Sequence, residues 1–434
     1  MRYLEINGQK RLEGEIKIQG SKNSVLPMIA ASILSEEKVV IKNCPDISDV
    51  RNMMGILEYL GGKCNFSNNV LEIDNSGIAE KELPPCCGTL RASIVFLGAM
   101  LARFGSVVMP YPGGCNIGNR PINYHIEGFE KMGAEIVCDK DILIGVFENN
   151  TDNCSYAFKT PSLGALENLI LGATALNGET VFYNCTTEPE IVDYCNFLKK
   201  MGAIIQGAGT KIITVKGNKK LHGCTYTVQG DRIVAGTYMT ALCVSGGNIR
   251  ITGIEPERMS GIVHYLRKMG MHIFTDCKTD AIIGTADMDL RNCSFIETGP
   301  YPMLATDLQP QLLAASCFVH GITGIKDNVY PNRYSIINEL KKMGANICIN
   351  ESDVVKHQPE VIVYGGASMC GADVYAKDLR AGAALVIAAL GCRGISHVYN
   401  CSYIERGYED IQRDLHCLGA DIEWKNDINR EKQE

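Results

Sequence analysis

The stretch FEKMGAEI, residues 129–136, decides the fold of this 434-residue chain, because five similar stretches occur elsewhere in it. They are LEYLGGKC (57–64), FLKKMGAII (197–205), YLRKMGMHI (265–273), ELKKMGANI (339–347) and DLHCLGADI (414–422). Their glycines stand at positions 61, 133, 202, 270, 344 and 419, which are 68 to 75 residues apart. Even spacing of this kind indicates an internal repeat, so six units fill the chain.

Each stretch reads as the end of a helix, then a glycine, then the start of a strand. The residue after a last helical turn is often left-handed, and glycine adopts that conformation without a Cβ penalty. Lysine just before the glycine, as in LKKMGA, also favours the negative end of the helix dipole. An ordinary helix-to-strand connection would explain one copy, but not six copies at even spacing.

An apolar helix precedes each of these stretches and is followed by a strand rich in β-branched residues. Examples are VLPMIAASILSEEKVVI (25–41) and AALVIAALGCRGISHV (383–398). Helices that are apolar nearly all round are expected inside a fold. We therefore expect an α/β protein with helices inside and sheets outside, in two domains of three units with a boundary near residue 230.

Composition excludes several classes of protein. With 42 Lys and Arg against 49 Asp and Glu, the net charge of -7 argues against a surface that wraps a polyanion. The N-terminus has no apolar signal segment, so we expect the 19 cysteines to be reduced thiols in the cytoplasm. The longest apolar runs are too short to span a membrane. Cysteine and histidine spacings predict no metal site, and no phosphate-binding glycine motif of the P-loop or Rossmann type is found.

Polar clusters open the first helix of every unit. Helix N-termini present free N–H groups and the positive end of the dipole, so lysine or arginine there makes an anion site. If the two domains face each other through these ends, several cations converge on one cleft. The clusters occupy residues 20–23, 90–93, 162–164, 230–232, 306–307 and 378–382.

The stretch from Tyr111 to Pro121 is a second functional candidate. Its three glycines and two prolines predict a loop, and such loops are candidates for lids over active sites. It carries one thiol, Cys115, and one guanidinium, Arg120. A thiol among glycines and beside an arginine is accessible and tunable, whereas most of the other cysteines are expected to be buried fillers.

Nine segments in this order resemble the UDP-N-acetylglucosamine 1-carboxyvinyltransferase family of enolpyruvyl transferases. They are GSKNSVLP (20–27), LRAS (90–93), PGGCNIGNRP (112–121), EPEIVD (188–193), DR (231–232), TDLQPQ (306–311), NR (332–333), KDLRAGAALV (377–386) and IERGYE (404–409). The resemblance covers the chain up to a polar tail after about residue 424. It implies two inside-out α/β barrel domains, each of three βαβαββ-type units. Residues 22–230 would form the first, and residues 1–21 with 231–434 the second, with the active site in the cleft between them.

The resemblance also implies a reaction. The enolpyruvyl group of phosphoenolpyruvate would move to the 3-hydroxyl of UDP-N-acetylglucosamine with release of phosphate, the first committed step of peptidoglycan synthesis. Addition and then elimination through a tetrahedral ketal needs one proton-transferring group near each reacting atom. It needs no cofactor and no metal. The expected partners are these small molecules, without nucleic acid or membrane, and the oligomeric state is open.

Site residues are carried over from the resemblance position by position. Cys115 corresponds to the thiol that protonates the methylene carbon and is alkylated by the antibiotic fosfomycin, and Asp307 to the carboxylate that receives the hydroxyl proton. Lys22 and Arg406 complete the catalytic set. The expected phosphoenolpyruvate ligands are Lys22, Asn23, Arg91, Arg120, Arg380 and Arg406. The expected acceptor ligands are Asn23, Arg91, Arg120, Pro121, Ile122, Asn123, Tyr124, Ser162, Leu163, Gly164, Asp307 and Val329.

Departures from the family pattern concentrate on the acceptor side. They are Asn123 in place of Asp, Thr160 in place of Lys, Thr186 and Thr187 in place of an Ala-Arg pair, and Pro331 in place of Glu. A paralogue that acts on another uridine nucleotide, such as UMP, is therefore an alternative. A non-catalytic binding relative is a second, although it would not need Cys115 and Asp307. A relative of the RNA 3′-phosphate cyclases would need a catalytic histidine near the C-terminus, where His416 reads as a solvated helix residue.

Overall fold

The computed structural model describes residues 2–113, 121–139, 141–147, 152–217, 220–287, 289–330, 333–350 and 360–426. These residues form two compact units, which we call the central unit (described residues between 20 and 229) and the terminal unit (residues 2–19 and 230–426). The chain enters the central unit at Gly20 and leaves it after Gln229. Ser21 donates its backbone N–H to Gln229 at 2.8 Å, so entry and exit lie side by side in this unit.

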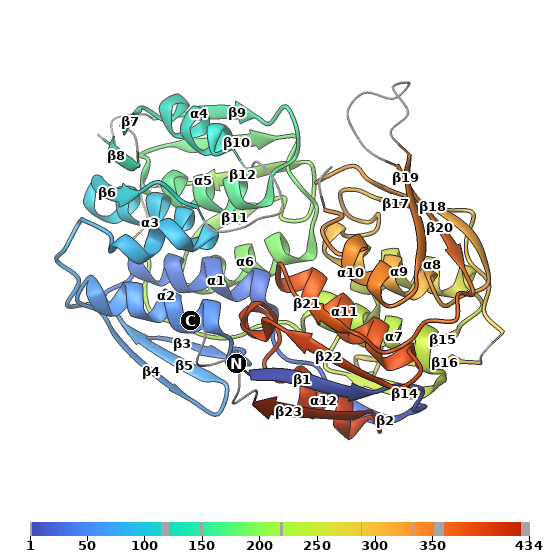
Figure 1. Ribbon diagram of the computed structural model, residues 1–434. Coiled ribbons are helices and arrows are strands. Elements are labelled where there is room, and N and C mark those ends of the chain that lie inside the picture. The colour runs from blue at the N-terminus through green and yellow to red at the C-terminus, as the bar shows by residue number, and fades with distance from the viewer. Residues whose placement is uncertain are drawn as a thin grey trace. The chain divides into compact units, whose positions relative to one another are not determined.

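The central unit alternates helices and strands (Figure 1). Its α-helices are α1 (Lys22–Ala31), α2 (Ser48–Tyr59), α3 (Val95–Phe104), α4 (Asn123–Lys131), α5 (Leu163–Ala175) and α6 (Pro189–Lys200), and its 3-10 helices are η1 (Ser32–Leu34), η2 (Pro85–Thr89) and η3 (Arg91–Ile94). Its strands are β3 (Val39–Lys42), β4 (Lys63–Ser67), β5 (Val70–Asp74), β6 (Ser106–Pro110), β7 (Ala134–Asp139), β8 (Ile142–Phe147), β9 (Cys154–Ala157), β10 (Glu179–Tyr183), β11 (Ile204–Gln206), β12 (Ile212–Lys216) and β13 (Thr225–Thr227).

The terminal unit repeats this alternation and begins with the N-terminal strands β1 (Arg2–Asn7) and β2 (Leu12–Lys17). Its helices are α7 (Arg232–Ser245), η4 (Pro256–Met259), α8 (Ser260–Lys268), η5 (Thr306–Leu308), α9 (Gln309–Ser316), α10 (Ile337–Lys342), α11 (Leu379–Gly391), η6 (Cys401–Arg406) and α12 (Ile411–Cys417). Its other strands are β14 (Gly247–Thr252), β15 (His272–Asp276), β16 (Ala281–Ala286), β17 (Phe295–Thr298), β18 (Gly321–Asp327), β19 (Asn346–Asn350), β20 (Glu360–Gly365), β21 (Asp373–Tyr375), β22 (Ile395–Tyr399) and β23 (Asp421–Asn426).

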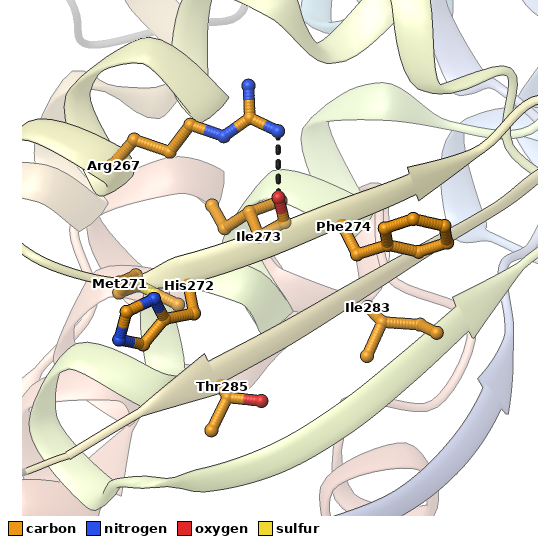
Figure 2. Close-up of a pocket in the computed structure, with 7 residues that line it drawn as sticks. All are labelled: Arg267, Met271, His272, Ile273, Phe274, Ile283 and Thr285. Carbon is orange, nitrogen blue, oxygen red and sulfur yellow. Dashed lines mark hydrogen bonds between the residues drawn. The ribbon is translucent and has the colours of Figure 1, made fainter.

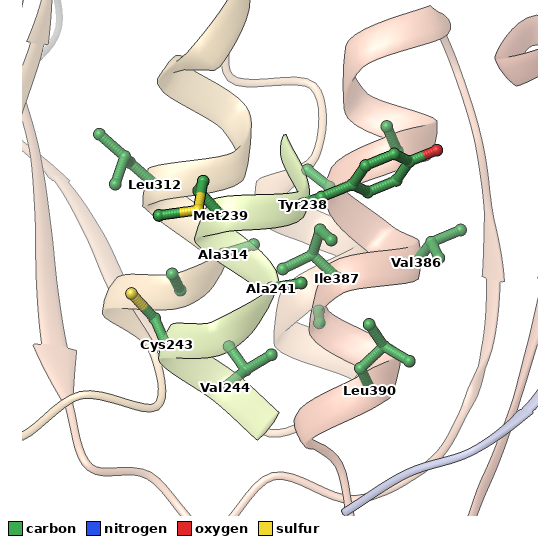
Figure 3. Packing of buried hydrophobic residues seen from close by; sticks show 14 of the residues in the cluster. Tyr238, Met239, Ala241, Cys243, Val244, Leu312, Ala314, Val386, Ile387 and Leu390 are labelled. Atoms are coloured by element: carbon green, nitrogen blue, oxygen red, sulfur yellow. The ribbon is translucent and has the colours of Figure 1, made fainter. Parts of the chain in front are cut away.

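The first helix of every repeat lies inside its unit. Helices α1, α3 and α5 pack on one another in the central unit, as α7, α9 and α11 do in the terminal unit. Figure 3 shows α7, with Met239 and Ala241, between Leu312 of α9 and Ile387 of α11. All 14 residues of α7 are buried, which matches a helix that is apolar nearly all round. Among the described residues, no helix has the length and apolar character needed to cross a membrane.

Sheets form the outer layer, and strand order repeats with the units. Five of the described sheets have four strands, in which a short first strand pairs parallel with its neighbour, as β2 does with β14 and β13 with β3. The remaining sheet has the order β6-β8-β7, and a single parallel bridge between Glu82 and Val108 stands where the first strand would be. Pro84 and Pro85 follow directly and lack the N–H groups that a longer ladder needs. This copy therefore departs from the expected βαβαββ pattern.

The six repeat glycines have the left-handed conformation that their positions predict. Their φ angles lie between +94° and +106°. The residue after the glycine donates back to the helix, as the N–H of Ala203 does to the carbonyl of Leu198 at 3.0 Å. These bonds satisfy carbonyls that the end of the helix leaves without partners. The prediction of a glycine helix stop in all six units is confirmed.

Replacing Gly270 by alanine is expected to lower the free energy of unfolding by about 1 kcal/mol, because a φ of +103° disfavours any side chain. A Cβ there would meet only Leu290, at 3.4 Å, so crowding adds little. Gly55→Ala is expected to raise that energy by about 0.5 kcal/mol, because Gly55 lies inside α2 and a Cβ would meet no atom within 4 Å. Urea unfolding followed by circular dichroism measures both. If both substitutions changed the free energy of unfolding in the same direction, the left-handed backbone at position 270 would not be what requires glycine there.

Candidate active site

The N-terminal ends of the three interior helices of the terminal unit lie together. Arg380, in the first turn of α11, reaches Asp307 in η5, just before α9. Its Nη2 and Nε atoms donate to Oδ2 of Asp307 at 2.9 and 3.1 Å. Asp231, which caps α7, acts electrostatically on the same guanidinium. Three helix starts thus form one cluster, in which the positive charge of Arg380 lies near the negative charges of Asp307 and Asp231.

A second arginine completes the ion pair of Asp307. Nη2 of Arg333 lies 2.8 Å from Oδ1, so each carboxylate oxygen faces its own guanidinium. Both arginine side chains are 3% exposed and that of Asp307 is 23% exposed. Burial acts to raise the pKa of Asp307, but the charges of Arg380 and Arg333 outweigh it and hold this pKa well below its usual range. Asp307 is therefore an anion and, in this arrangement, a weak base.

The backbone that carries Arg380 is fixed by a helix cap. Asp378 accepts from the N–H groups of Arg380 and Ala381 at 3.0 and 2.9 Å. Ser335 donates its hydroxyl to the other carboxylate oxygen at 3.1 Å. An N-cap of this kind typically contributes about 1 kcal/mol, and here it also sets the direction in which the arginine leaves the helix.

Asp327, at the end of β18, organises the neighbouring loop. Its carboxylate accepts from the hydroxyls of Thr306 and Thr298 at 2.6 and 2.9 Å, and from the backbone N–H groups of Val329 and Tyr330 at 2.9 Å each. Thr306 directly precedes Asp307, so this carboxylate supports the residue beside the ion pair. It also places Val329, an expected acceptor residue, in an exposed turn.

Two buried guanidinium donors have no acceptor among the described residues. Within the described part of the chain, no atom accepts from Nη1 of Arg380 or Nε of Arg333. Buried polar groups are nearly always hydrogen-bonded, and leaving a charged one unpaired is costly. The Arg380 guanidinium also stands 5.8 Å from the ring of Tyr408, whose hydroxyl is 2.7 Å from that of Thr237 on α7. An anionic ligand would supply the missing acceptors.

Arg406 is the last residue of η6 and is partly exposed. The segment that follows it is tied to the N-terminal part of the chain through Gln19. The side chain of Gln19 donates to the carbonyl of Gly407 at 3.1 Å and accepts from the N–H of Glu409 at 2.8 Å. Hydrogen bonds from Gln19 to Gly407 and Glu409 thus help to position Arg406, an expected catalytic residue.

In the central unit, Lys22 is the first residue of α1 and forms a shielded ion pair. Its Nζ lies 2.7 Å from Oδ2 of Asp49, in the first turn of α2, and the two side chains are 11% and 3% exposed. Asn23, the next residue of the helix, is half-buried. A carboxylate therefore compensates the lysine charge, as Asp307 compensates Arg380 in the terminal unit.

Arg91, in η3, bonds to the backbone on both sides of the glycine-rich loop. Its Nη1 donates to the carbonyl of Pro112 at 3.3 Å and its Nη2 to that of Pro121 at 3.4 Å. The expected residues Cys115 and Arg120 lie between these two prolines and outside the described residues. Their predicted roles stay predictions.

Asn168 of α5 joins three helices behind Arg91. Its Oδ1 accepts from the N–H of Gly98 at 2.6 Å, and its Nδ2 donates to the carbonyl of Ile94 at 2.9 Å. The same Nδ2 is 2.8 Å from Nδ1 of His125, which therefore accepts and leaves the ring proton on Nε2. A Cβ at Gly98 would lie 2.4 Å from the Asn168 oxygen, so glycine is needed for this approach.

The expected acceptor residues of the central unit lie at the starts of α4 and α5. Asn123 donates from Nδ2 to Oε1 of Glu127 at 3.5 Å, and the hydroxyl of Tyr156 is 3.4 Å from the other oxygen of that carboxylate. The ring of Tyr124 meets that of Phe158 edge-on at 6.1 Å. Pro121 and Ile122 lie immediately before α4. Ser162, Leu163 and Gly164 lie at the beginning of α5.

Comparison with known proteins decides the family. The profile of the family described as EPSP synthase (3-phosphoshikimate 1-carboxyvinyltransferase) matches residues 6–415. A relative named UDP-N-acetylglucosamine 1-carboxyvinyltransferase 2, from Caldanaerobacter subterraneus subsp. tengcongensis, is 39% identical over 97% of this chain and 99% of its own. A UDP-N-acetylglucosamine 1-carboxyvinyltransferase from Wolbachia pipientis wMel is 39% identical over 96% of this chain and 97% of its own. The chain belongs to the enolpyruvyl transferase family. It is accordingly a carboxyvinyl transferase.

Solved structures of enolpyruvyl transferases share the fold. The enolpyruvyl transferase NikO from Streptomyces tendae superposes with a TM-score of 0.85 at 24% identity, over 98% of this chain and 99% of that one. An EPSP synthase from Acinetobacter baumannii gives 0.72 at 18% identity, over 98% and 100%. At these identities the likeness concerns the fold alone. It confirms the expected pair of inside-out α/β barrels.

Two charged residues of this enolpyruvyl transferase were missed as site candidates. Arg333 belongs to the quoted NR segment but was assigned no role, although it bonds directly to Asp307. Asp49 pairs with Lys22 and lies in no quoted segment. An acidic residue in the first turn of a helix is also an ordinary helix-start signal. Sequence alone therefore gave no reason to single out Asp49.

A surface hollow of about 420 Å³ lies in the terminal unit beside β15 and β16 (Figure 2). Figure 2 shows Arg267 above the strands, with its guanidinium bonded to the carbonyl of Ile273, and His272, Phe274 and Thr285 along them. It is lined by Arg267, Met271, His272, Ile273, Phe274, Ile283 and Thr285. None of these is an expected site residue, so the hollow is separate from the ion-pair cluster.

The pH dependence of stability is expected to carry a contribution from His125. Burial lowers its pKa to about 3, with a further lowering from the charge of Arg91. The unfolded residue binds a proton near pH 6.5, so stability is lost as the pH falls from 6.5 toward 3. Relative to His125→Gln, the wild type should lose about 2 kcal/mol between pH 7 and pH 5. Urea unfolding of both proteins at the two pH values measures this difference. If the free energy of unfolding fell equally in the wild type and in His125→Gln, His125 would be charged in the folded state.

Proposed function

We propose that the chain transfers the enolpyruvyl group of phosphoenolpyruvate to the 3-hydroxyl of UDP-N-acetylglucosamine and releases phosphate. In a cell this would be the first committed step of peptidoglycan synthesis, in the cytoplasm. The observation that carries the acceptor is the 39% identity, over nearly the full length of both chains, to relatives named for this substrate. The ion-pair cluster around Asp307 supports the chemistry independently.

The donor carries a phosphate and a carboxylate, and cations are its natural ligands. Our proposal assigns Lys22, Asn23, Arg91, Arg120, Arg380 and Arg406 to it. Nη1 of Arg380 is buried and has no acceptor among the residues that the structure describes. This supports the assignment, because planar guanidinium groups bind both kinds of anion in a bidentate manner. The ion pair with Asp49 orients the ammonium group of Lys22 before the donor binds.

The proton path follows from addition and elimination. The acceptor oxygen bonds to C2 of phosphoenolpyruvate, its proton passes to Asp307, and the Cys115 thiol protonates C3. Loss of a C3 proton and of phosphate from the tetrahedral ketal then gives the enolpyruvyl ether. Asp307 is a weak base while Arg380 and Arg333 hold it. A donor anion that engages Arg380 weakens that ion pair, which raises the pKa of Asp307 and makes it a better base.

The acceptor is proposed to contact a set of twelve residues. They are Asn23, Arg91, Arg120, Pro121, Ile122, Asn123, Tyr124, Ser162, Leu163, Gly164, Asp307 and Val329. Transfer to another uridine nucleotide, such as UMP, is the alternative that the departures on the acceptor side favour. Asn123 and Thr160 are both exposed, so these two departures do not follow from core packing.

Phosphate release from phosphoenolpyruvate tests the proposal directly. We expect turnover with UDP-N-acetylglucosamine and kcat/KM at least about tenfold lower with UMP, since a site that fits the sugar gains binding energy from it. Coupled detection of inorganic phosphate measures both. Faster turnover with UMP would move the chain to the alternative acceptor, and ligand binding without any phosphate release would identify a non-catalytic relative.

Cys115→Asp is expected to retain turnover and to abolish inactivation by fosfomycin, because a carboxyl group can donate the same proton but is not alkylated as a thiolate is. Residual activity after incubation with the antibiotic is the measurement. Cys138→Ser is the control, since Cys138 is an exposed thiol outside the proposed site and its replacement should leave the sensitivity unchanged. Inactivation of the Cys115→Asp protein at the wild-type rate would contradict the role given to this thiol.

A further inference from the structure

We propose that Tyr408 is a positioning residue for Arg380, one of the arginines assigned to the anions of phosphoenolpyruvate. Tyr408 lies in the short segment between η6 and α12, and the guanidinium of Arg380 stands over the face of its ring. The inference rests on the proposed function, which makes Arg380 a ligand of the donor. It adds a residue that belongs to none of the proposed ligand sets.

The ring of Tyr408 meets a buried cation. The central carbon of the Arg380 guanidinium lies 5.8 Å from the centroid of the ring, and the two residues are 3% and 1% exposed. A guanidinium within about 6 Å of an aromatic face is attracted by the quadrupole of the ring, and more strongly where both groups are desolvated. Asp307 binds Nε and Nη2 of the same guanidinium. The ring and the carboxylate therefore hold Arg380 together, and both contacts leave Nη1 to a ligand.

Polar side chains of two interior helices fix the ring of Tyr408. Thr237 of α7 donates its one hydroxyl proton to the carbonyl of Ile233 at 2.8 Å, so it accepts from the hydroxyl of Tyr408, 2.7 Å away. Nε2 of Gln311 in α9 donates to the same tyrosine oxygen at 3.4 Å. Burial raises the pKa of Tyr408, so the phenol keeps the proton that it donates. With Arg380 on α11, Tyr408 contacts side chains of all three interior helices of the terminal unit.

The backbone of Tyr408 is fixed by the N-terminal part of the chain. The side-chain amide of Gln19 donates to the carbonyl of Gly407 at 3.1 Å and accepts from the N–H of Glu409 at 2.8 Å, so it bonds to one residue on each side of the tyrosine. A Cβ at Gly407 would lie 2.8 Å from Cδ2 of Leu379, the first residue of α11. The segment therefore also passes close to the start of the helix that carries the arginine.

Removing the aromatic face should weaken binding of the donor and not of the acceptor. Methionine fills irregular space in a core but offers a guanidinium no ring. We expect Tyr408→Met to raise KM for phosphoenolpyruvate about tenfold and KM for UDP-N-acetylglucosamine less than about twofold. Tyr408→Phe keeps the ring and should hold KM for phosphoenolpyruvate within about threefold of the wild-type value. Steady-state phosphate release by the full-length protein measures these constants.

Tyr238→Met is the matched control for loss of core packing. Tyr238 is a fully buried tyrosine of α7 in the same unit (Figure 3), and its hydroxyl donates to Asp414 of α12 at 2.8 Å. Tyr238→Met and Tyr408→Met both remove a buried ring and its hydroxyl, so both should lower the midpoint of urea unfolding. Neither Tyr238 nor Asp414 belongs to a proposed ligand set. Tyr238→Met should therefore leave KM for phosphoenolpyruvate near the wild-type value.

Chemical modification supplies a readout that does not depend on turnover. Phenylglyoxal reacts with accessible guanidinium groups, and Arg380 is 3% exposed in the wild type. Its modification, followed by mass spectrometry of the peptide that contains it, should be at least about fivefold faster in Tyr408→Met than in the wild type, Tyr408→Phe or Tyr238→Met. Gln19→Met frees the backbone on both sides of Tyr408 without removing the ring, so it should also speed this modification. It provides the test if Tyr408→Met does not fold.

Equal changes in KM for the two substrates in Tyr408→Met would overturn the inference, and so would a tenfold rise in KM for phosphoenolpyruvate in Tyr408→Phe or Tyr238→Met, on the scale of about 1.4 kcal/mol per factor of ten. An unchanged rate of Arg380 modification in Tyr408→Met and Gln19→Met would overturn it as well. Failure of the wild type to release phosphate would instead count against the proposed function. The modification rates would then decide on Tyr408 alone.

Discussion

Six helices that are apolar on nearly every side must be covered on every side, and the rest of the structure follows from this constraint. Sheets with one polar face supply the cover, so each unit has helices within and strands without. Polar chemistry is then excluded from the middle of these helices. It remains possible at their first turns, where backbone N–H groups lack partners and the dipole is positive. Lys22, Asp307 and Arg380 stand at such helix starts.

The cations at these helix starts are kept in place by carboxylates. Lys22 forms an ion pair with Asp49, and Asp307 forms ion pairs with both Arg380 and Arg333. An unpaired charge would be costly in such a setting, whereas a paired one is held in position until an anionic substrate competes for it. The same pairing therefore also sets the basicity of Asp307. In the proposed reaction, donor binding and proton transfer are coupled through the ion pair of Arg380 with Asp307.

Repeat architecture and helix ends were predictable because they depend on local residues. Each repeat glycine predicts the left-handed turn in which it lies, and the polar cluster that contains Arg380 predicts the start of a helix. Three features were not predictable, because each depends on a partner distant in sequence. Arg333 acquires its role only from Asp307, and Arg91 bonds to backbone carbonyls, which every residue has. The reduced strand at Glu82 reflects prolines whose effect on pairing shows only beside Val108.

The terminal unit is assembled from both ends of the polypeptide. Strand β1 pairs with β22 and β23, and β2 with β14, so the strand partners described for residues 2–7 and 12–17 lie in residues 247–252 and 395–426. Every strand of the central unit lies between residues 39 and 227. On the ribosome, the whole sequence of the central unit is therefore available before the first strands of the chain have any partner. Strand β2 must wait until β14 has been made, and β1 until translation is nearly finished.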